Sequence, residues 1–123
     1  VVNVVNEDLA EAMNISSGTY PPETDEFKET GLTPEMGDIV KAPMVFEAPV
    51  KMECRLNQVL EFGEALATNR FVIGEVVCIH IKDEVFYDDE IQMSELKAVG
   101  RLGGRGADQY CRISDSFEIK RPA

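Results

Sequence analysis

Long apolar runs and basic residues are both scarce in this sequence. No apolar run approaches the ~20 residues that a membrane-spanning helix needs, and no signal peptide is visible, so we expect no membrane association. The 12 Lys and Arg residues are outnumbered by 23 Asp and Glu residues, which gives a formal charge of −11 at pH 7. Nucleic-acid binding depends on neutralising phosphates with basic side chains, so this balance argues against a nucleic-acid partner.

Histidine and cysteine are also too few for several kinds of site. His80 is the single histidine, which excludes any site that needs two. Cys54, Cys78 and Cys111 are odd in number and widely spaced, which fits neither a disulfide framework nor a zinc ribbon. Three free thiols in a reducing compartment are the simplest interpretation. We therefore expect a cytoplasmic protein without a metal site.

The chain opens on a strand-like run rather than on a loop. The segment from Val1 to Asn6 is rich in valine, which is typical of a strand, and a domain rarely begins in mid-strand. A length of 123 residues and an apolar content of 44% suit one globular domain. We expect residues 1–123 to be the C-terminal part of a single domain whose opening strands precede Val1. The alternative is processing, or an expression boundary, at a natural start.

Two neighbouring strands dominate the predicted secondary structure. Apolar and polar residues alternate from Val50 to Asn57, which indicates a half-buried strand with one wet face. The segment from Phe71 to Ile81 is apolar on both faces, which predicts a central strand antiparallel to the first. Gly74 inside it indicates a bulge, or a place where another backbone or a ligand comes close.

The remaining segments predict short elements around this pair. Asn6 is suited to cap a first helix, and Gly31 is suited to end a second one. Together these patterns favour a mainly β fold, an antiparallel barrel or sheet with short peripheral helices. The predicted helices lie near residues 7–13, 24–29 and 92–99, and the predicted short strands lie at 39–40, 44–46, 110–113 and 117–120.

The glycine-rich, basic loop from Arg101 to Gly106 is the best candidate for ligand binding. Glycines let backbone N–H groups approach a ligand, and Arg101 or Arg105 can grip a phosphate or carboxylate through two hydrogen bonds. A turn with solvated arginines is the other interpretation. The loop matches neither the phosphate-loop pattern nor the dinucleotide-binding glycine pattern.

Two polar residues interrupt the apolar strand before Ile81. His80 is expected to share a face with Val76 and Cys78, either as a packed, hydrogen-bonded residue or as a group that contacts a cofactor ring or helps to move a proton. Glu75 on the opposite face is expected to be a buried carboxylate, which needs a partner. Arg55 on the adjacent strand is the partner that we predict.

Other polar residues give weaker signals. Ser16, Ser17 and Tyr20 lie in a predicted loop, where they are either ordinary loop residues or ligand contacts. Cys54 alternates inward along its strand, which predicts a core thiol.

Six pieces of the sequence occur in a characteristic order: Val1–Val5, Ser16–Ser17 with Tyr20, Asp25–Phe27 with Gly31–Thr33, Glu53–Cys54, Ile73–Val77 with His80, and Arg101–Gly104 with Tyr110. Together they resemble a known family: the second half of the flavin-reductase-like, FMN-binding split-barrel proteins. The resemblance spans Val1 to Pro122, and the ordered set is more specific than any piece of it. The stretch from Arg105 to Asp108 is longer than the family's usual form, which affects the placement of Tyr110.

The resemblance implies an antiparallel split β-barrel of Greek-key-like order, usually a homodimer, with FMN near the dimer interface. It implies hydride transfer from NADH or NADPH to flavin, which then reduces free flavin, a partner oxygenase or ferric iron. The family's main FMN-phosphate contacts would lie upstream of Val1. Within this sequence it implies that His80 lies near the reacting rings, and that the flavin or nicotinamide is approached by Ser16, Ser17, Tyr20, Arg101, Gly103 and Gly104.

Three functional hypotheses follow. The first is an FMN-dependent, NAD(P)H-oxidising flavin reductase, whose chemistry belongs to the cofactor and needs no strong acid or base from the protein. The second is a non-enzymatic FMN carrier or electron-transfer protein. The third is a β-barrel interaction domain without a cofactor. Bleaching of bound flavin by a nicotinamide discriminates the first from the second.

Overall fold

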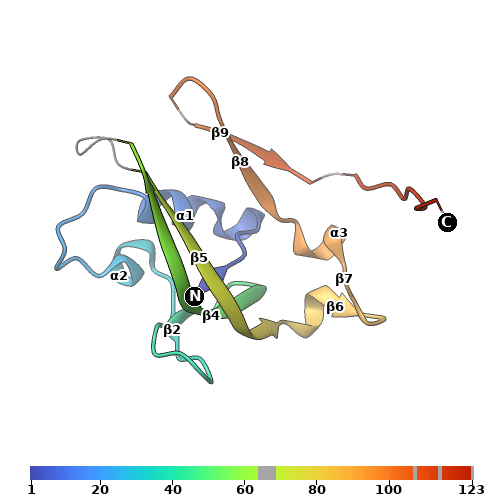
Figure 1. The fold of residues 1–123 in the computed structure, drawn as a ribbon, viewed down its shortest axis with the longest axis horizontal. Helices are drawn as coiled ribbons and strands as arrows, with labels where there is room; N and C mark the ends of the chain where they lie inside the picture. The colour runs from blue at the N-terminus through green and yellow to red at the C-terminus, as the bar shows by residue number, and fades with distance from the viewer. Residues whose placement is uncertain (64–68, 107, 114, 123) are drawn as a thin grey trace.

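A long antiparallel hairpin organises the fold of this chain. The computed structural model describes residues 1–63, 69–106, 108–113 and 115–122. Strands β4 (Val50–Phe62) and β5 (Asn69–Ile81) pair along their length, and β1 (Val2–Asn3) pairs with the other edge of β4 (Figure 1). Both long strands were predicted. The prediction that the second is central was wrong, because in the described sheet the order β1-β4-β5 makes β4 the central strand.

Two register shifts in this hairpin decide which side chains share a face. Glu53 pairs with Cys78, but the next residue of β4, Cys54, pairs with Val76. The extra residue in β5 is a β-bulge, which reverses the face of the side chains that follow it. Cys78 and His80 therefore share a face with Glu53, whereas Val76 lies with Cys54 on the other. The expectation that Val76 and His80 share a face was wrong for this reason.

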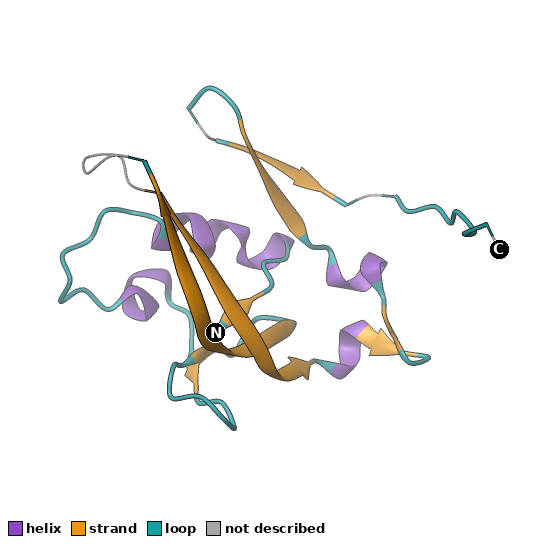
Figure 2. Ribbon diagram, in the orientation of Figure 1, coloured by secondary structure: helices purple, strands orange, loops and turns teal. Residues whose placement is uncertain are grey.

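Short elements complete the mainly β fold, with small helices beside the hairpin (Figure 2). No described helix has the length and apolar content required to cross a membrane. The short strands are β2 (Pro34–Glu35), β3 (Met44–Val45), β6 (Phe86–Tyr87), β7 (Glu90–Ile91), β8 (Val99–Gly103) and β9 (Gln109–Arg112). The helices are α1 (Ala10–Ser16), α2 (Glu26–Thr30) and α3 (Met93–Leu96), with 3₁₀ turns at Glu7–Leu9 and Asp83–Val85.

The helix ends follow from capping chemistry. The Asn6 side chain accepts a hydrogen bond from the Leu9 N–H and so caps the first turn, as predicted. Asp25 caps α2 in the same way through the Phe27 N–H. Gly31 ends α2 with a left-handed φ of 69°, which glycine adopts without strain.

A small apolar core lies where the hairpin meets the segment after it. Val50, Val85 and Leu96 are buried together, and partly buried apolar residues pack around them, including Ile81 and Val4. Two predicted short strands are absent from the described structure. Ile39–Val40 is a loop whose N–H groups bind a side chain instead, and Phe117–Lys120 pairs with no described strand.

The predicted wet face of β4 is wet only along its later half. Lys51 and Glu53 are among the most buried polar residues, at 6% and 0% exposure. The loop from Gly37 to Val40 covers this end of the strand, and Lys51 forms an ion pair with Glu35. Glu75, which we expected to be a buried carboxylate paired with Arg55, is exposed; it lies opposite Arg55 in the strand register, but the two form no ion pair among the described residues.

Candidate functional site

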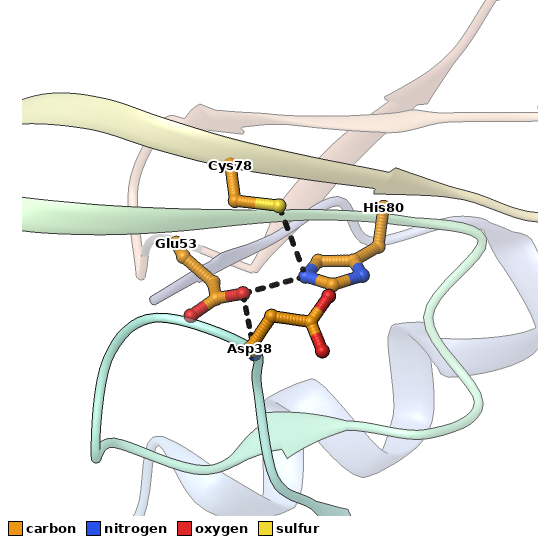
Figure 3. Close-up of side chains that lie close together, drawn as sticks. All are labelled: Asp38, Glu53, Cys78 and His80. Atoms are coloured by element: carbon orange, nitrogen blue, oxygen red, sulfur yellow. Dashed lines mark hydrogen bonds and ion pairs between the residues drawn. The ribbon is translucent and has the colours of Figure 1, made fainter.

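The most highly bonded polar group of the described chain is the buried carboxylate of Glu53 (Figure 3). Its Oε1 accepts hydrogen bonds from the Asp38 N–H at 2.9 Å and from His80 Nε2 at 2.7 Å. Its Oε2 accepts from the Ile39 N–H at 2.8 Å and the Val40 N–H at 2.6 Å. Four bonds therefore compensate for the removal of this charge from water.

The loop before β3 is shaped to hold this carboxylate. Three consecutive backbone N–H groups, from Asp38 to Val40, converge on it and form an anion-binding nest. The preceding residue must be glycine because a Cβ on Gly37 would lie 2.5 Å from Oε2 of Glu53. One buried side chain of the hairpin thus fixes a loop that is 13 to 15 residues away in sequence.

These bonds keep Glu53 ionised. The hydrogen bond from the Val40 N–H, followed by the bond with His80, lowers the pKa of the Glu53 carboxyl from 4.5 to about 2, although burial acts in the opposite direction. At neutral pH the carboxylate is therefore an acceptor only.

The ionised state of Glu53 determines which ring nitrogen of His80 carries the shared hydrogen. Since the carboxylate can only accept, Nε2 of His80 carries the hydrogen of the 2.7 Å bond. In the neutral ring the lone pair then lies on Nδ1, and the ring is fixed by its bond to a buried group. The imidazole is 24% exposed, so it remains within reach of a ligand.

Cys78 and Asp38 complete the cluster around His80. The sulfur of Cys78 lies 3.6 Å from Nε2 of His80, and one ligand atom from each of Asp38, Glu53, Cys78 and His80 lies within 4.8 Å of the others. This donor set has the chemistry of a zinc site. Both oxygens of Glu53 already accept two hydrogen bonds each, so the arrangement is a hydrogen-bond network rather than a ready set of ligands.

The Cys78 thiol is expected to be a poor nucleophile. Burial first, and then the charges of Glu53 and Asp38, raise the pKa of Cys78 above its ordinary value of 9.0. Because the thiolate is the reactive form, alkylation of Cys78 by iodoacetamide should reach half its maximal rate only above pH 9. Peptide mass spectrometry across a pH series measures this. Half-maximal labelling below pH 8 would contradict the burial and charge effects described here.

The predicted hydroxyl contacts lie at the end of α1. The hydroxyls of Ser16, Ser17 and Tyr20 donate to the carbonyl oxygens of Met13, Asn14 and Ile15, at 2.8, 2.7 and 3.0 Å. The donors are therefore used within the chain, but each oxygen keeps lone pairs that can accept from a ligand. Ser16 also lines a hollow of about 190 Å³ beside α1.

The predicted basic loop divides between a strand and a turn: Arg101 to Gly103 end β8, and Gly104 to Gly106 follow in the turn toward β9. Gly103 and Gly104 have φ values of 80° and 79°, a left-handed conformation that glycine adopts at low cost. Arg101 is exposed and pairs with Tyr110 across the hairpin. The ion pair between Arg112 and Glu7, at 2.9 Å, ties the base of the hairpin to the start of the first helix.

The predicted residues thus occupy three separate elements, with His80 on β5, the hydroxyls at the end of α1 and Arg101 on the β8–β9 hairpin. His80 is hydrogen-bonded to Glu53, and the three hydroxyls are hydrogen-bonded to carbonyl oxygens of α1, so these bonds do not join the two groups to each other. Sequence reasoning missed Glu53 and its nest. The only available signal was Glu53–Cys54 as one piece of the family resemblance.

Comparison with known proteins decides the family. The sequence model of the flavin reductase like domain matches residues 1–94. The chain belongs to this family. An uncharacterized protein of Halalkalibacterium halodurans is 35% identical over 126 residues, covering 99% of this chain and 58% of its own length. The uncharacterized YwrF of Bacillus subtilis is 34% identical, covering 100% and 60%.

Solved flavin reductase-like structures share the fold. Nitrilotriacetate monooxygenase component B from Bacillus cereus aligns with a TM-score of 0.85 at 28% identity, covering 96% of this chain and 58% of that one. A putative flavin reductase with a split barrel domain, from Shewanella frigidimarina, aligns with a TM-score of 0.80 at 30% identity, covering 98% and 59%. The split-barrel expectation is thereby confirmed. The chain spans about three fifths of the length of these relatives.

The donor set present here suits a flavin nucleotide in its chemistry. A guanidinium and the backbone N–H groups of a glycine turn donate to phosphate oxygens, and hydroxyl oxygens whose own hydrogens are donated to the backbone can accept from the hydroxyl groups of a sugar chain. The hollows beside α1 and the β8–β9 hairpin, of about 190 and 200 Å³, are smaller than the pockets that enclose whole cofactors.

Proposed function

We propose that the protein is an FMN-binding oxidoreductase of the flavin reductase type, which transfers hydride from NADH or NADPH to flavin. Membership of the flavin reductase like domain family carries this proposal. Its support is the fold shared with component B of a nitrilotriacetate monooxygenase and with a putative flavin reductase, both at 25% identity or more. An FMN carrier without nicotinamide oxidation is the alternative.

In this proposal the flavin supplies the hydride chemistry, and the chain binds and orients it. Arg101 would grip phosphate oxygens through two hydrogen bonds, beside the backbone of Gly103 and Gly104. The oxygens of Ser16, Ser17 and Tyr20 would accept hydrogen bonds from the cofactor, because their own hydrogens are already donated to the backbone.

His80 would act as a fixed polar contact of the reacting rings. Glu53 holds its Nε2–H, so the ring keeps one orientation while the lone pair of Nδ1 stays available as an acceptor. Hydride transfer needs no strong acid or base from the protein, so a single oriented imidazole suffices.

The proposal extends to assembly and location. A homodimer that works in the cytoplasm, with a partner oxygenase as one acceptor of its reduced flavin, fits the neighbour that is a monooxygenase component. Three free cysteines fit a reducing compartment.

The binding role of Arg101 is tested by its replacement with alanine in the full natural chain. Losing a charge-assisted contact should raise the Kd for FMN about tenfold or more, since such bonds contribute about 1.5–3 kcal/mol. Arg70→Ala is the matched control, because Arg70 is an exposed arginine on β5 that pairs with Glu61. Fluorescence titration gives both constants. An equal Kd for wild type and Arg101→Ala would remove Arg101 from the site.

A further inference from the structure

The C-terminal part of the chain has a charge opposite to that of the rest. Residues 97–122, here called the C-terminal arm, contain six basic and three acidic residues, a net charge of +3. Residues 1–96 contain six basic and 20 acidic residues, a net charge of −14, and the two parts together give the −11 of the chain. A basic segment on an acidic body is attracted to acidic surfaces.

The arm also presents large apolar side chains to solvent. Phe117 is 84% exposed and Ile119 is 77% exposed, and Leu102 is exposed on the β8–β9 hairpin. Lys120 and Arg121, which follow directly, have no ion-pair partner in the described part of the chain. Apolar anchors beside basic groups are typical of a segment that docks on a partner.

Within the described residues, the hydrogen bonds and the ion pair that join the arm to the body lie at its base. The Val99 N–H donates to the Val5 carbonyl at 3.1 Å, and Arg112 forms its ion pair with Glu7. From residue 115 to residue 122 no backbone hydrogen bond joins the arm to any other described residue. Figure 1 shows this end running away from the β4–β5 hairpin.

A complementary surface lies on the β6–β7 hairpin. Residues 83–90, here called the acidic hairpin, carry five exposed carboxylates and two exposed aromatic rings, Phe86 at 39% and Tyr87 at 55% exposure. Asp88 and Asp89 form the turn in the left-handed conformation, with φ of 55° and 60°. Their two carboxylates therefore lie at the tip of the hairpin. The five carboxylates belong to Asp83, Glu84, Asp88, Asp89 and Glu90.

We propose that the C-terminal arm of one copy docks on the acidic hairpin of a second copy. Each copy has one basic, apolar arm and one acidic, aromatic hairpin, so two copies satisfy each other in a closed two-fold arrangement. Phe117 and Ile119 pack against the rings of the acidic hairpin while Lys120 and Arg121 pair with its carboxylates. This deepens the homodimer part of the proposed function and does not depend on flavin.

Photo-crosslinking from position 117 tests the contact. The full natural chain with p-benzoylphenylalanine in place of Phe117 is prepared in ordinary and ¹⁵N-labelled form, mixed and irradiated, with and without FMN. The proposal predicts covalent dimers whose mixed-isotope peptides join position 117 to residues 83–90 of the other copy. Cross-links confined to one chain, cross-links to other surfaces of the second copy, or an absence of cross-links would each overturn it.

Charge reversal gives an independent measurement. Lys120→Glu with Arg121→Glu should raise the dimer dissociation constant at least tenfold, measured by sedimentation equilibrium. Adding Asp88→Lys and Asp89→Lys to the same chain should restore it. Lys28→Glu with Lys41→Glu is the control, since both lysines are exposed on other elements. An unchanged constant in the arm variant, or no restoration, would contradict the docking. A flavin spectrum of each variant separates this outcome from a failure of the proposed function.

Discussion

Replacing Glu53 with glutamine is expected to lower the melting temperature of the protein by at least about 5 °C. Glutamine keeps the shape but replaces one acceptor oxygen with an NH₂ group, which faces backbone N–H groups that already point at it. Buried donors left without an acceptor are strongly destabilising. Thermal unfolding followed by circular dichroism measures the change.

Glu61→Gln is the matched control for this substitution. Glu61 lies on the same strand, its side chain is 57% exposed, and its ion pair with Arg70 lies at the surface. Exposed pairs contribute little, so its melting temperature should stay within about 2 °C of wild type. Equal effects of the two substitutions would show that the nest around Glu53 does not stabilise the fold.

The difference in stability between wild type and Glu53→Gln is expected to depend on pH. The pKa of Glu53 is lowered to about 2 in the folded protein from 4.5. Its contribution is therefore complete above pH 4.5 and is lost as the pH falls from 4.5 toward 2. The difference in melting temperature between wild type and Glu53→Gln should be largest at neutral pH and should shrink below pH 4.5. A difference that grows on acidification would contradict the assignment.

Replacing Gly37 with alanine is expected to destabilise the protein by about 1–3 kcal/mol. The new Cβ would lie 2.5 Å from Oε2 of Glu53, an atom that two backbone N–H groups hold in place. The lower entropy of the unfolded chain offsets only part of this cost. Urea unfolding at neutral pH measures the free energy of unfolding.

Two comparisons isolate the cause of the Gly37 effect. In Gly18→Ala the new Cβ meets the ring of Tyr20, a partly exposed side chain that can turn away, so the loss should be smaller. In a Glu53→Ala background the obstructing carboxylate is gone, and Gly37→Ala should cost little more. Equal costs of Gly37→Ala in both backgrounds would show that the two residues are not coupled.

The two strands of the hairpin could be predicted from sequence because alternation and β-branched content act locally, although β4 continues to Phe62 beyond the predicted end at Asn57. The burial of Glu53 could not, because it depends on a loop that folds back onto the strand from 13 to 15 residues away. Alternation placed Glu53 on the wet face of the strand, and nothing in the pattern of β4 reveals the covering loop. The bulge that puts Val76 and His80 on opposite faces of β5 was also missed. A single unpaired residue does not change the residue types along the strand, so the sequence pattern carries no sign of it.

The cofactor contacts predicted from sequence stay predictions, and the structure gives the arrangement of their residues. The glycines after Arg101 were expected to form either a ligand-binding loop or a turn with solvated arginines, and Gly103 and Gly104 adopt the conformation that only glycine enters readily. The partner of His80 was not predicted. In the structure, His80 lies opposite Lys51 in the strand register, but its hydrogen bond runs diagonally to Glu53 on the same strand as Lys51.

The most direct test of the account is a visible absorption spectrum of the purified full natural chain, recorded without oxygen before and after NADPH or NADH is added. A flavin reductase should show a flavin spectrum that one of the nicotinamides bleaches and that returns in air. A flavin spectrum indifferent to both nicotinamides would contradict the reductase and favour a carrier. A protein that stays colourless after incubation with FMN would contradict flavin binding itself.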